Sequence, residues 1–123
     1  MLSHEDAVAG KRPEDTVALC GYFIDIHNGA GEGTYRVSIE EPFGIPYLCL
    51  VSKDISNLMM AGRDISVDSV TFGATRIMNV CMAAGQAAGE AAAMAVSEGK
   101  LPKEVDVQEL RKHLLEQKAI LDV

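Results

Sequence analysis

Two polar residues near the end of an apolar stretch, Asp25 and His27, are the first that could do chemistry. They belong to residues 16–27, TVALCGYFIDIH, whose alternation predicts a strand, or two short strands on either side of Gly21. Residues two apart in a strand point the same way at a spacing of about 7 Å. The carboxylate and the imidazole are therefore expected to lie together, where they can act as acid and base. The alternative is structural, with polar residues that cap the turn after the strand.

The second candidate is the turn Gly62-Arg63-Asp64. It follows the apolar run LMMA at residues 58–61, which predicts a short buried strand. A strand that stops at a glycine lets a ligand come close to the backbone, and the two charged side chains are then available to it. This layout is typical of a ligand site, although a plain strand–helix connection has the same residues.

The third candidate is the start of a long helix predicted at residues 75–98. Gly73 and Ala74 allow a ligand to approach exposed backbone N–H groups. The helix dipole adds about half a positive charge at this end, and Arg76 adds a full one. Residues 65–72 connect this helix to the preceding turn. The turn and the helix start are therefore expected to form one binding site for a carbonyl oxygen or an anion.

The elements that must position these residues run strands first and helices last, which predicts an α+β fold. The length of 123 residues suggests a single domain. Short strands are predicted at residues 16–27, 34–39, 47–51 and 58–61, and a turn at residues 40–46. The polar residues 1–15 are expected to form a tail or an entry loop.

The predicted helices carry boundary signals. Gly99 and Pro102 are stop signals for the long helix. A second helix is expected to start with Asp106 as its N-cap and Glu109 as the partner of a capping box. Its amphipathic pattern continues through residues 119–121, and we interpret it as a packing element. A stripe of small side chains on the long helix is expected to let another backbone pack closely. Its members are Cys81, Gly85, Gly89 and Ala93.

The glycine-rich segment GAGEG at residues 29–33 is not interpreted as a dinucleotide site. A dinucleotide fingerprint has the spacing GxGxxG and opens a helix. Here a strand pattern follows at residues 34–39. We expect a hairpin loop.

Composition excludes several classes of function. Eighteen acidic against eleven basic residues give a net charge of −7, which disfavours nucleic-acid binding because that affinity rests on Lys and Arg. Residues 80–96 are interrupted by Gln86 and Glu90, so no membrane span is expected. Residues 1–6 are polar rather than a secretory signal, which predicts a cytoplasmic protein. The three cysteines are widely spaced in apolar runs without CxxC, so we expect buried free thiols and no metal site.

Two longer segments resemble a known family. GIPYLCLVSKDISNLMMAGRDIS, followed by GATRIMNVCMAAGQAAGEAAAMA, is similar to the C-terminal part of FAD-dependent oxidoreductases of the glutathione-reductase-like group. The subgroup that it resembles most is the bacterial family sometimes labelled putative xanthan lyases. YFIDIHN also looks like that subgroup's substrate-domain strand. The resemblance covers residues 16–120 and involves several motifs in order.

The resemblance implies FAD as the cofactor and assigns roles to the candidate residues. The turn after residues 58–61 would pass the pyrophosphate and ribityl chain, and the helix start would face the pyrimidine edge of the flavin. A helix N-terminus there stabilises the negative charge that this edge gains on reduction. Asp25 and His27 would lie in the substrate domain near the reactive face as catalytic residues. The implied cofactor-binding residues are Gly62, Arg63, Asp64, Gly73, Ala74, Thr75, Arg76, Ile77 and Met78.

One departure from the family pattern is large. The first Rossmann strand, its GxGxxG and the ribose-binding acidic residue do not occur in the sequence. We therefore interpret the chain as a C-terminal fragment with a polar segment at residues 1–15, part of the substrate domain at 16–56 and part of the FAD domain at 57–123. Its expected partners are the missing N-terminal Rossmann half and an unidentified small-molecule substrate, with self-association of the isolated chain. Alone, it is expected to bind FAD weakly or not at all and to be inactive.

Two other hypotheses stay open from the sequence. One is a non-enzymatic α+β module that binds a ligand or a partner through the helix start at Thr75. The other is a folded remnant without activity.

Overall fold

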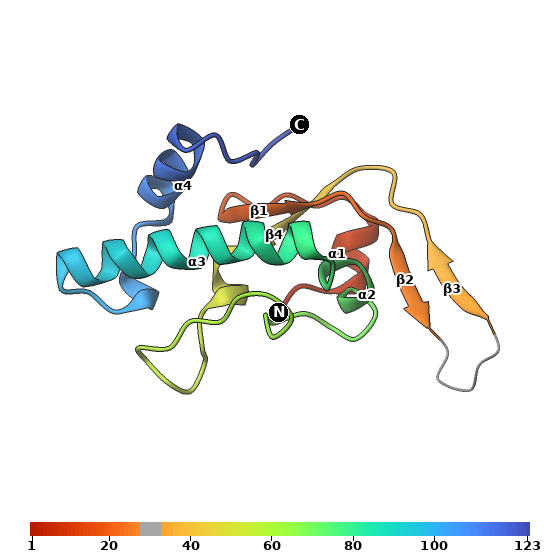
Figure 1. Cartoon of the computed structure of the whole chain (residues 1–123), viewed down its shortest axis with the longest axis horizontal. Coiled ribbons are helices and arrows are strands. Elements are labelled where there is room, and N and C mark those ends of the chain that lie inside the picture. The colour runs from red at the N-terminus through yellow and green to blue at the C-terminus, as the bar shows by residue number, and fades with distance from the viewer. Residues whose placement is uncertain (28–32) are drawn as a thin grey trace.

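The computed structural model describes residues 1–27 and 33–123, so the predicted loop at residues 29–33 lies outside the described residues except for Gly33. Short antiparallel strands come first, and a long helix and a C-terminal helix follow, which confirms the predicted α+β class (Figure 1). The elements are α1 (His4–Val8), β1 (Thr16–Cys20), β2 (Ile24–His27), β3 (Thr34–Val37), β4 (Phe43–Pro46), η1 (Tyr47–Leu50), α2 (Phe72–Thr75), α3 (Met78–Glu98), η2 (Pro102–Glu104) and α4 (Val107–Glu116).

The β1–β4 pair forms the sheet that packs on α3. The strands run antiparallel, with Leu19 opposite Gly44 and Cys20 opposite Phe43. The turn predicted at residues 40–46 is therefore wrong in its second half, where β4 forms. Phe43 and Ile45 are fully buried, so the burial of two large apolar side chains favours the strand despite the neighbouring glycine and prolines.

The second pair, β2–β3, is a hairpin that extends away from the rest of the molecule (Figure 1). Its register places Asp25 opposite Arg36 and His27 opposite Thr34. The prediction of two short strands around Gly21 is confirmed, and so is a strand within residues 34–39. The hairpin is attached to the body mainly through α2.

Two of the predicted strands are wrong. Of residues 47–51, the first four form the 3₁₀ helix η1, because Tyr47 and Leu50 both turn inward and the Tyr47 hydroxyl donates to the Pro102 carbonyl at 2.7 Å. Residues 58–61 make only an isolated bridge between Val51 and Met59, and Leu58 is 38% exposed. A buried strand needs hydrogen-bonding neighbours on its edges, and the described chain offers it only the short stretch 50–52.

The predicted helix start at residue 75 is also wrong. The short helix α2 ends at Thr75, and α3 begins separately at Met78 after Ile77, whose backbone is extended with φ −77° and ψ 153°. The Arg76 carbonyl accepts a hydrogen bond from Arg63 Nε at 3.2 Å. That carbonyl would bond within the helix if the helix were continuous. The predicted end is confirmed, with Gly99 as a left-handed C-cap at φ 63°.

The buried face of α3 is not the predicted stripe. Gly85, Gly89 and Ala93 are exposed, and a Cβ placed on either glycine would meet no atom within 4 Å. The glycines of the stripe therefore pack on no other described part of this chain. The side chains that pack on β1 and the rest of the core lie on the opposite side of the helix: Val80, Ala84, Ala87, Ala91, Met94 and Ala95.

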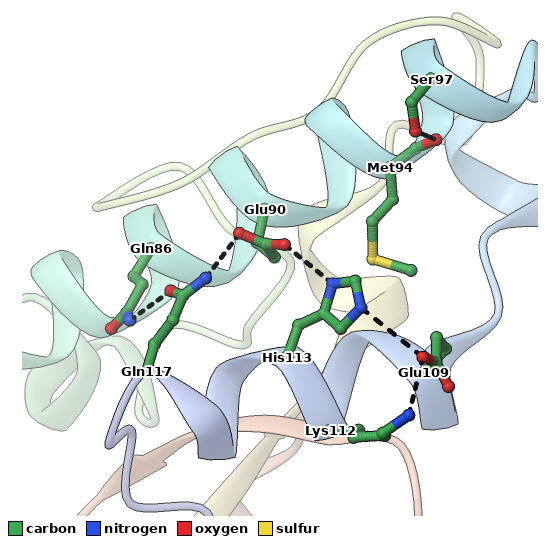
Figure 2. Close-up of polar contacts among 8 residues, drawn as sticks. All are labelled: Gln86, Glu90, Met94, Ser97, Glu109, Lys112, His113 and Gln117. Carbon is green, nitrogen blue, oxygen red and sulfur yellow. Dashed lines mark hydrogen bonds and ion pairs between the residues drawn. The ribbon is translucent and has the colours of Figure 1, made fainter.

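The C-terminal helix α4 begins as predicted. The Asp106 side chain accepts from the backbone N–H groups of Gln108 and Glu109. The helix does not continue through residues 119–121, because it ends at Glu116 and Lys118 adopts a positive φ of 68°. Side chains of α3 and α4 meet in a chain of polar contacts along one side (Figure 2).

The N-terminal segment is not the predicted tail. Leu2 is 2% exposed and pairs with Val67 in a parallel bridge, and Ser3 caps α1. The Leu2 N–H donates to the Ser66 carbonyl at 2.9 Å. Leu2 and the fully buried Ala7 thus fix a largely polar segment to the core. Among the described residues, no helix combines the length and apolar character that a membrane crossing requires.

Candidate functional site

The centre of the candidate site is the buried carboxylate of Asp25, whose side chain is only 10% exposed. Three cationic or ionisable groups surround it. His27 Nε2 lies 3.2 Å from Oδ2, Arg36 Nε lies 3.3 Å from Oδ1, and Arg76 Nη2 lies 3.6 Å from Oδ2. The structure thus brings Asp25 and His27 together and adds two arginines to the pair.

Strand pairing and one close backbone contact explain this cluster. The β2–β3 register sets Arg36 directly opposite Asp25, where side chains lie on the same face of the hairpin. Arg76 reaches the cluster because α2 packs on β2: a Cβ at Gly73 would lie 2.8 Å from the Asp25 carbonyl oxygen. Arg76 Nη2 also donates to that carbonyl at 3.3 Å. The absence of a side chain at Gly73 therefore lets the hairpin meet α2 and the Arg76 segment.

The geometry orients His27 for proton transfer. Asp25 holds Nε2, and the His27 side chain is 64% exposed. A carboxylate on one ring nitrogen fixes the tautomer and the ring orientation, and the other nitrogen is then available to exchange a proton with a bound molecule. The pair has the arrangement of a carboxylate-oriented acid or base.

A pocket of about 260 Å³ opens beside this cluster. It combines charged groups with an apolar wall and one hydroxyl. Its lining residues are Asp25, Ile26, His27, Ser69, Phe72, Gly73 and Arg76.

The predicted cofactor-binding segments are only partly brought together. Arg63 lies against Arg76 through the hydrogen bond to its carbonyl, and Gly62 turns the chain with φ 89°. Asp64 is exposed, and no hydrogen bond or ion pair joins its side chain to another described residue.

Gly73, Ala74 and Thr75 do not present free N–H groups, so that expectation is wrong. Their N–H groups donate to carbonyls within the α2 turn, at 3.0 to 3.1 Å, and all three residues are buried.

The open helix N-terminus lies at Met78 instead. Ile77 is the N-cap of α3 and its side chain accepts no hydrogen bond, and Met78 is 79% exposed. The first N–H groups of a 21-residue helix have no intrahelical acceptor, and none of the described side chains caps them. These donors fit an acceptor oxygen or an anionic edge of a ligand.

Sequence reasoning missed Arg36, Ser69 and Phe72. Arg36 could have been found by pairing the two strands across the intervening loop, which places it opposite Asp25. Its guanidinium also lies 5.3 Å from the centre of the Phe23 ring. No signal in the sequence marks Ser69 or Phe72, because only the tertiary packing of α2 brings them to the pocket.

The cysteines take no part in this chemistry. Burial raises the pKa of the Cys20 thiol to about 11, and burial also raises the pKa of Cys49. The Cys20 thiol donates to the Ala74 carbonyl at 3.6 Å. The prediction of free thiols is confirmed, with Cys81 half-buried rather than fully buried.

The fold and the site define an α+β protein in which a pocket lined by Asp25, His27 and Arg76 lies beside an uncapped helix N-terminus. A family model described as FAD dependent oxidoreductase matches residues 1–114. The chain belongs to this family, whose cofactor is FAD. No curated protein and no solved structure matched the chain.

Proposed function

We propose that the chain is the C-terminal part of an FAD-dependent oxidoreductase of the glutathione-reductase-like group, in the subgroup sometimes labelled putative xanthan lyases. In this proposal it supplies the flavin-facing turn and helix. The observation that carries the proposal is the uncapped N-terminus of α3 at Met78. Beside it, Arg63 Nε donates a hydrogen bond to the carbonyl of Arg76, two residues before Met78. The family match over residues 1–114 supports the chemistry.

The residues at this end of α3 suit the electron-rich edge of a flavin. The N–H groups of Met78 and Asn79 point out of the first turn, and the helix dipole favours negative charge there. Arg63 adds a positive charge beside them, and Gly62 lets the chain turn closely past a ligand. FAD, when bound, supplies the hydride chemistry. The chain's own role is to position this edge and to stabilise its charge.

Asp25 and His27 are proposed as the groups that hold and move a proton on the substrate side. His27 exchanges the proton, and Asp25 orients its ring from 3.2 Å. Arg76 lies between this pair and the start of α3, since its side chain contacts Asp25 and its carbonyl accepts from Arg63. The proton-handling pair and the proposed flavin-facing turn are therefore adjacent.

The proposal includes a separate Rossmann half as partner. Three features support it: the sequence lacks GxGxxG, residues 58–61 have few backbone partners, and the small-residue stripe of α3 is exposed. A Rossmann half would supply the missing GxGxxG. Its parallel sheet could be extended by residues 58–61 and covered by α3, which would give both elements the packing partners that they lack. In the same proposal, residues 16–56 derive from the substrate domain and residues 57–123 from the FAD domain. In this chain both parts share one core, because β1 packs on α3.

The substitution Met78→Pro in the full-length oxidoreductase tests the placement. Proline is well tolerated at the first helical position after an extended residue, so the helix is kept while one N–H donor is removed. We expect FAD affinity to fall roughly fivefold, the value of one hydrogen bond of about 1 kcal/mol, as measured by flavin fluorescence. Met78→Ala, which keeps the N–H, is the control and should bind FAD as the wild type does. Equal affinity of the proline and alanine variants would contradict the proposal.

A further inference from the structure

We propose that the pocket beside Asp25 binds a small organic carboxylate, held by Arg36 and Arg76 with His27 at its rim. As an assignment of the substrate class, this rests on the proposed function above; as a binding site, it stands on the pocket alone. Asp25, His27 and Arg76 line the pocket, and Arg36, which is not a lining residue, contacts Asp25 from β3 beside it.

The first argument is charge balance. Asp25 contributes one negative charge, while Arg36 and Arg76 contribute two positive charges within 3.6 Å of its oxygens. The cluster therefore has an excess of at least one positive charge, and His27 adds another when it is protonated. Arg76 is the partly buried arginine, with a side chain that is 35% exposed, whereas Arg36 is 64% exposed. A partly buried charge such as that of Arg76 is costly unless an opposite charge completes it. A single carboxylate from a ligand would balance the two arginines.

The second argument is hydrogen-bonding capacity. Arg36 contacts Asp25 through Nε alone, and Arg76 uses only Nη2. Neither arginine forms the two-pronged pair that matches a guanidinium to a carboxylate. Among the described residues, no hydrogen bond involves either Nη atom of Arg36. Within the described ranges 1–27 and 33–123 nothing occupies these donors, and they can bind the carboxylate of a ligand.

The third argument is the shape and polarity of the pocket. Its volume of about 260 Å³ lies below the range of pockets for drug-sized ligands, so the occupant is small. Phe72 and Ile26 provide an apolar wall, and Ser69 provides one hydroxyl. A short apolar body with one planar carboxylate fits this lining better than a fully polar anion such as phosphate.

A titration of the chain without FAD tests the site. The probes are butanoate, its uncharged isostere butanamide, and inorganic phosphate, each followed by two-dimensional NMR of the backbone, the arginine Nε–H groups and the His27 ring. We expect saturable shifts at β2, Arg76 and His27 with butanoate only. Saturable binding of butanamide would contradict the proposal by showing that the ligand's charge does not matter. Binding of phosphate as tight as that of butanoate would show that the pocket does not select carboxylates. The absence of saturable butanoate shifts would overturn the site.

Variants sharpen the test. Arg36→Gln, at a side chain that is 64% exposed, should keep the fold and weaken butanoate binding about tenfold, or 1.4 kcal/mol. Asp25→Asn should tighten it, because the competing carboxylate is removed while both arginines remain. The matched control is Arg12→Gln, since Arg12 also pairs with an aspartate, Asp122, at 3.0 Å. An unchanged affinity in Arg36→Gln, or weaker binding by a folded Asp25→Asn, would contradict the proposal.

The outcome is separable from the flavin proposal. Butanoate binding needs no FAD, so it succeeds or fails on the pocket alone. The Met78→Pro experiment measures FAD affinity at the start of α3 and does not read out this pocket.

Discussion

Gly73 is the residue on which the geometry of the candidate site depends most directly. It lies where α2 meets β2, and a Cβ there would lie 2.8 Å from the Asp25 carbonyl oxygen and 3.1 Å from the Asp25 nitrogen. Both neighbours are backbone atoms, which cannot rotate away as a side chain can. A single methyl group would therefore separate Asp25 from Arg76.

The substitution Gly73→Ala should destabilise the fold by about 1–3 kcal/mol, the usual cost of overpacking. Urea unfolding followed by circular dichroism measures this. The matched control is Gly85→Ala on α3, where a Cβ meets open space; it should stabilise the chain by up to about 1 kcal/mol through helix propensity. A Gly73→Ala variant as stable as the wild type would show that the α2–β2 contact is looser than described.

At this scale the sequence predicts some of the site and not the rest. The alternation of residues 16–27 was enough to expect Asp25 and His27 side by side, because strand period is local. Arg36 and Arg76 join them through hairpin register and through the packing of α2, which no local pattern encodes. The free N–H groups were expected three to five residues too early, since nothing in TFGATRIM marks the break at Ile77.

Among the elements, α4 shows how a local signal determines a helix boundary. The Asp106 side chain accepts from two backbone N–H groups, at 2.9 and 3.2 Å. Asp106→Ala should lower the free energy of unfolding by about 1 kcal/mol, as measured by urea denaturation. Asp106→Ser keeps a cap and should recover most of that loss. If serine and alanine are equally destabilising, the cap is not the source of the stability.

The contact between α3 and α4 is expected to depend on pH through Glu90. Its carboxylate accepts from Gln117 Nε2 at 2.8 Å and pairs with His113 Nδ1 at 3.0 Å (Figure 2). The hydrogen bond from Gln117, followed by that from His113, lowers the pKa of Glu90 below its usual 4.5. A lowered pKa in the folded state means that the contribution is fully present above about pH 4.5 and is lost as the pH falls through the folded value.

We therefore expect Glu90→Gln to be less stable than the wild type at pH 7, by less than about 1 kcal/mol because the contact is near the surface. The difference should shrink below pH 4.5, as chemical denaturation at the two pH values would show. Glu116→Gln, at the last residue of α4 and without a partner among the described residues, should change little at either pH. A Glu90→Gln difference that does not depend on pH would contradict the assignment.

For the whole molecule, the sequence predicts the class correctly and misplaces elements whose partners are distant. The α+β order, the long helix and its Gly99 stop follow from periodicity and end signals. The strand expected at residues 58–61 and the packing of the small-residue stripe both require neighbours that the described chain does not provide. A local sequence pattern indicates which secondary structure a segment favours, whereas the partners that stabilise it depend on tertiary packing.

An FAD titration of the purified chain tests the proposed division into two halves. We expect no saturable quenching of flavin fluorescence at micromolar concentrations and a colourless protein as isolated, because the pyrophosphate-binding Rossmann unit is not in the sequence. A circular-dichroism spectrum with the expected helix content shows that the sample is folded. Tight binding, or a yellow protein as isolated, would mean that the chain completes a flavin site by itself.

The close approach at Gly73 has an evolutionary consequence. Wherever a relative keeps the hairpin at this distance from α2, natural selection must retain glycine at the equivalent position, because every other residue adds a Cβ that meets the Asp25 backbone. A homologue with a larger residue there must have moved its hairpin outward, and the arginine that follows three positions later would lose its carboxylate partner. In an alignment of relatives, the glycine, the aspartate and the arginine should therefore be kept or lost together.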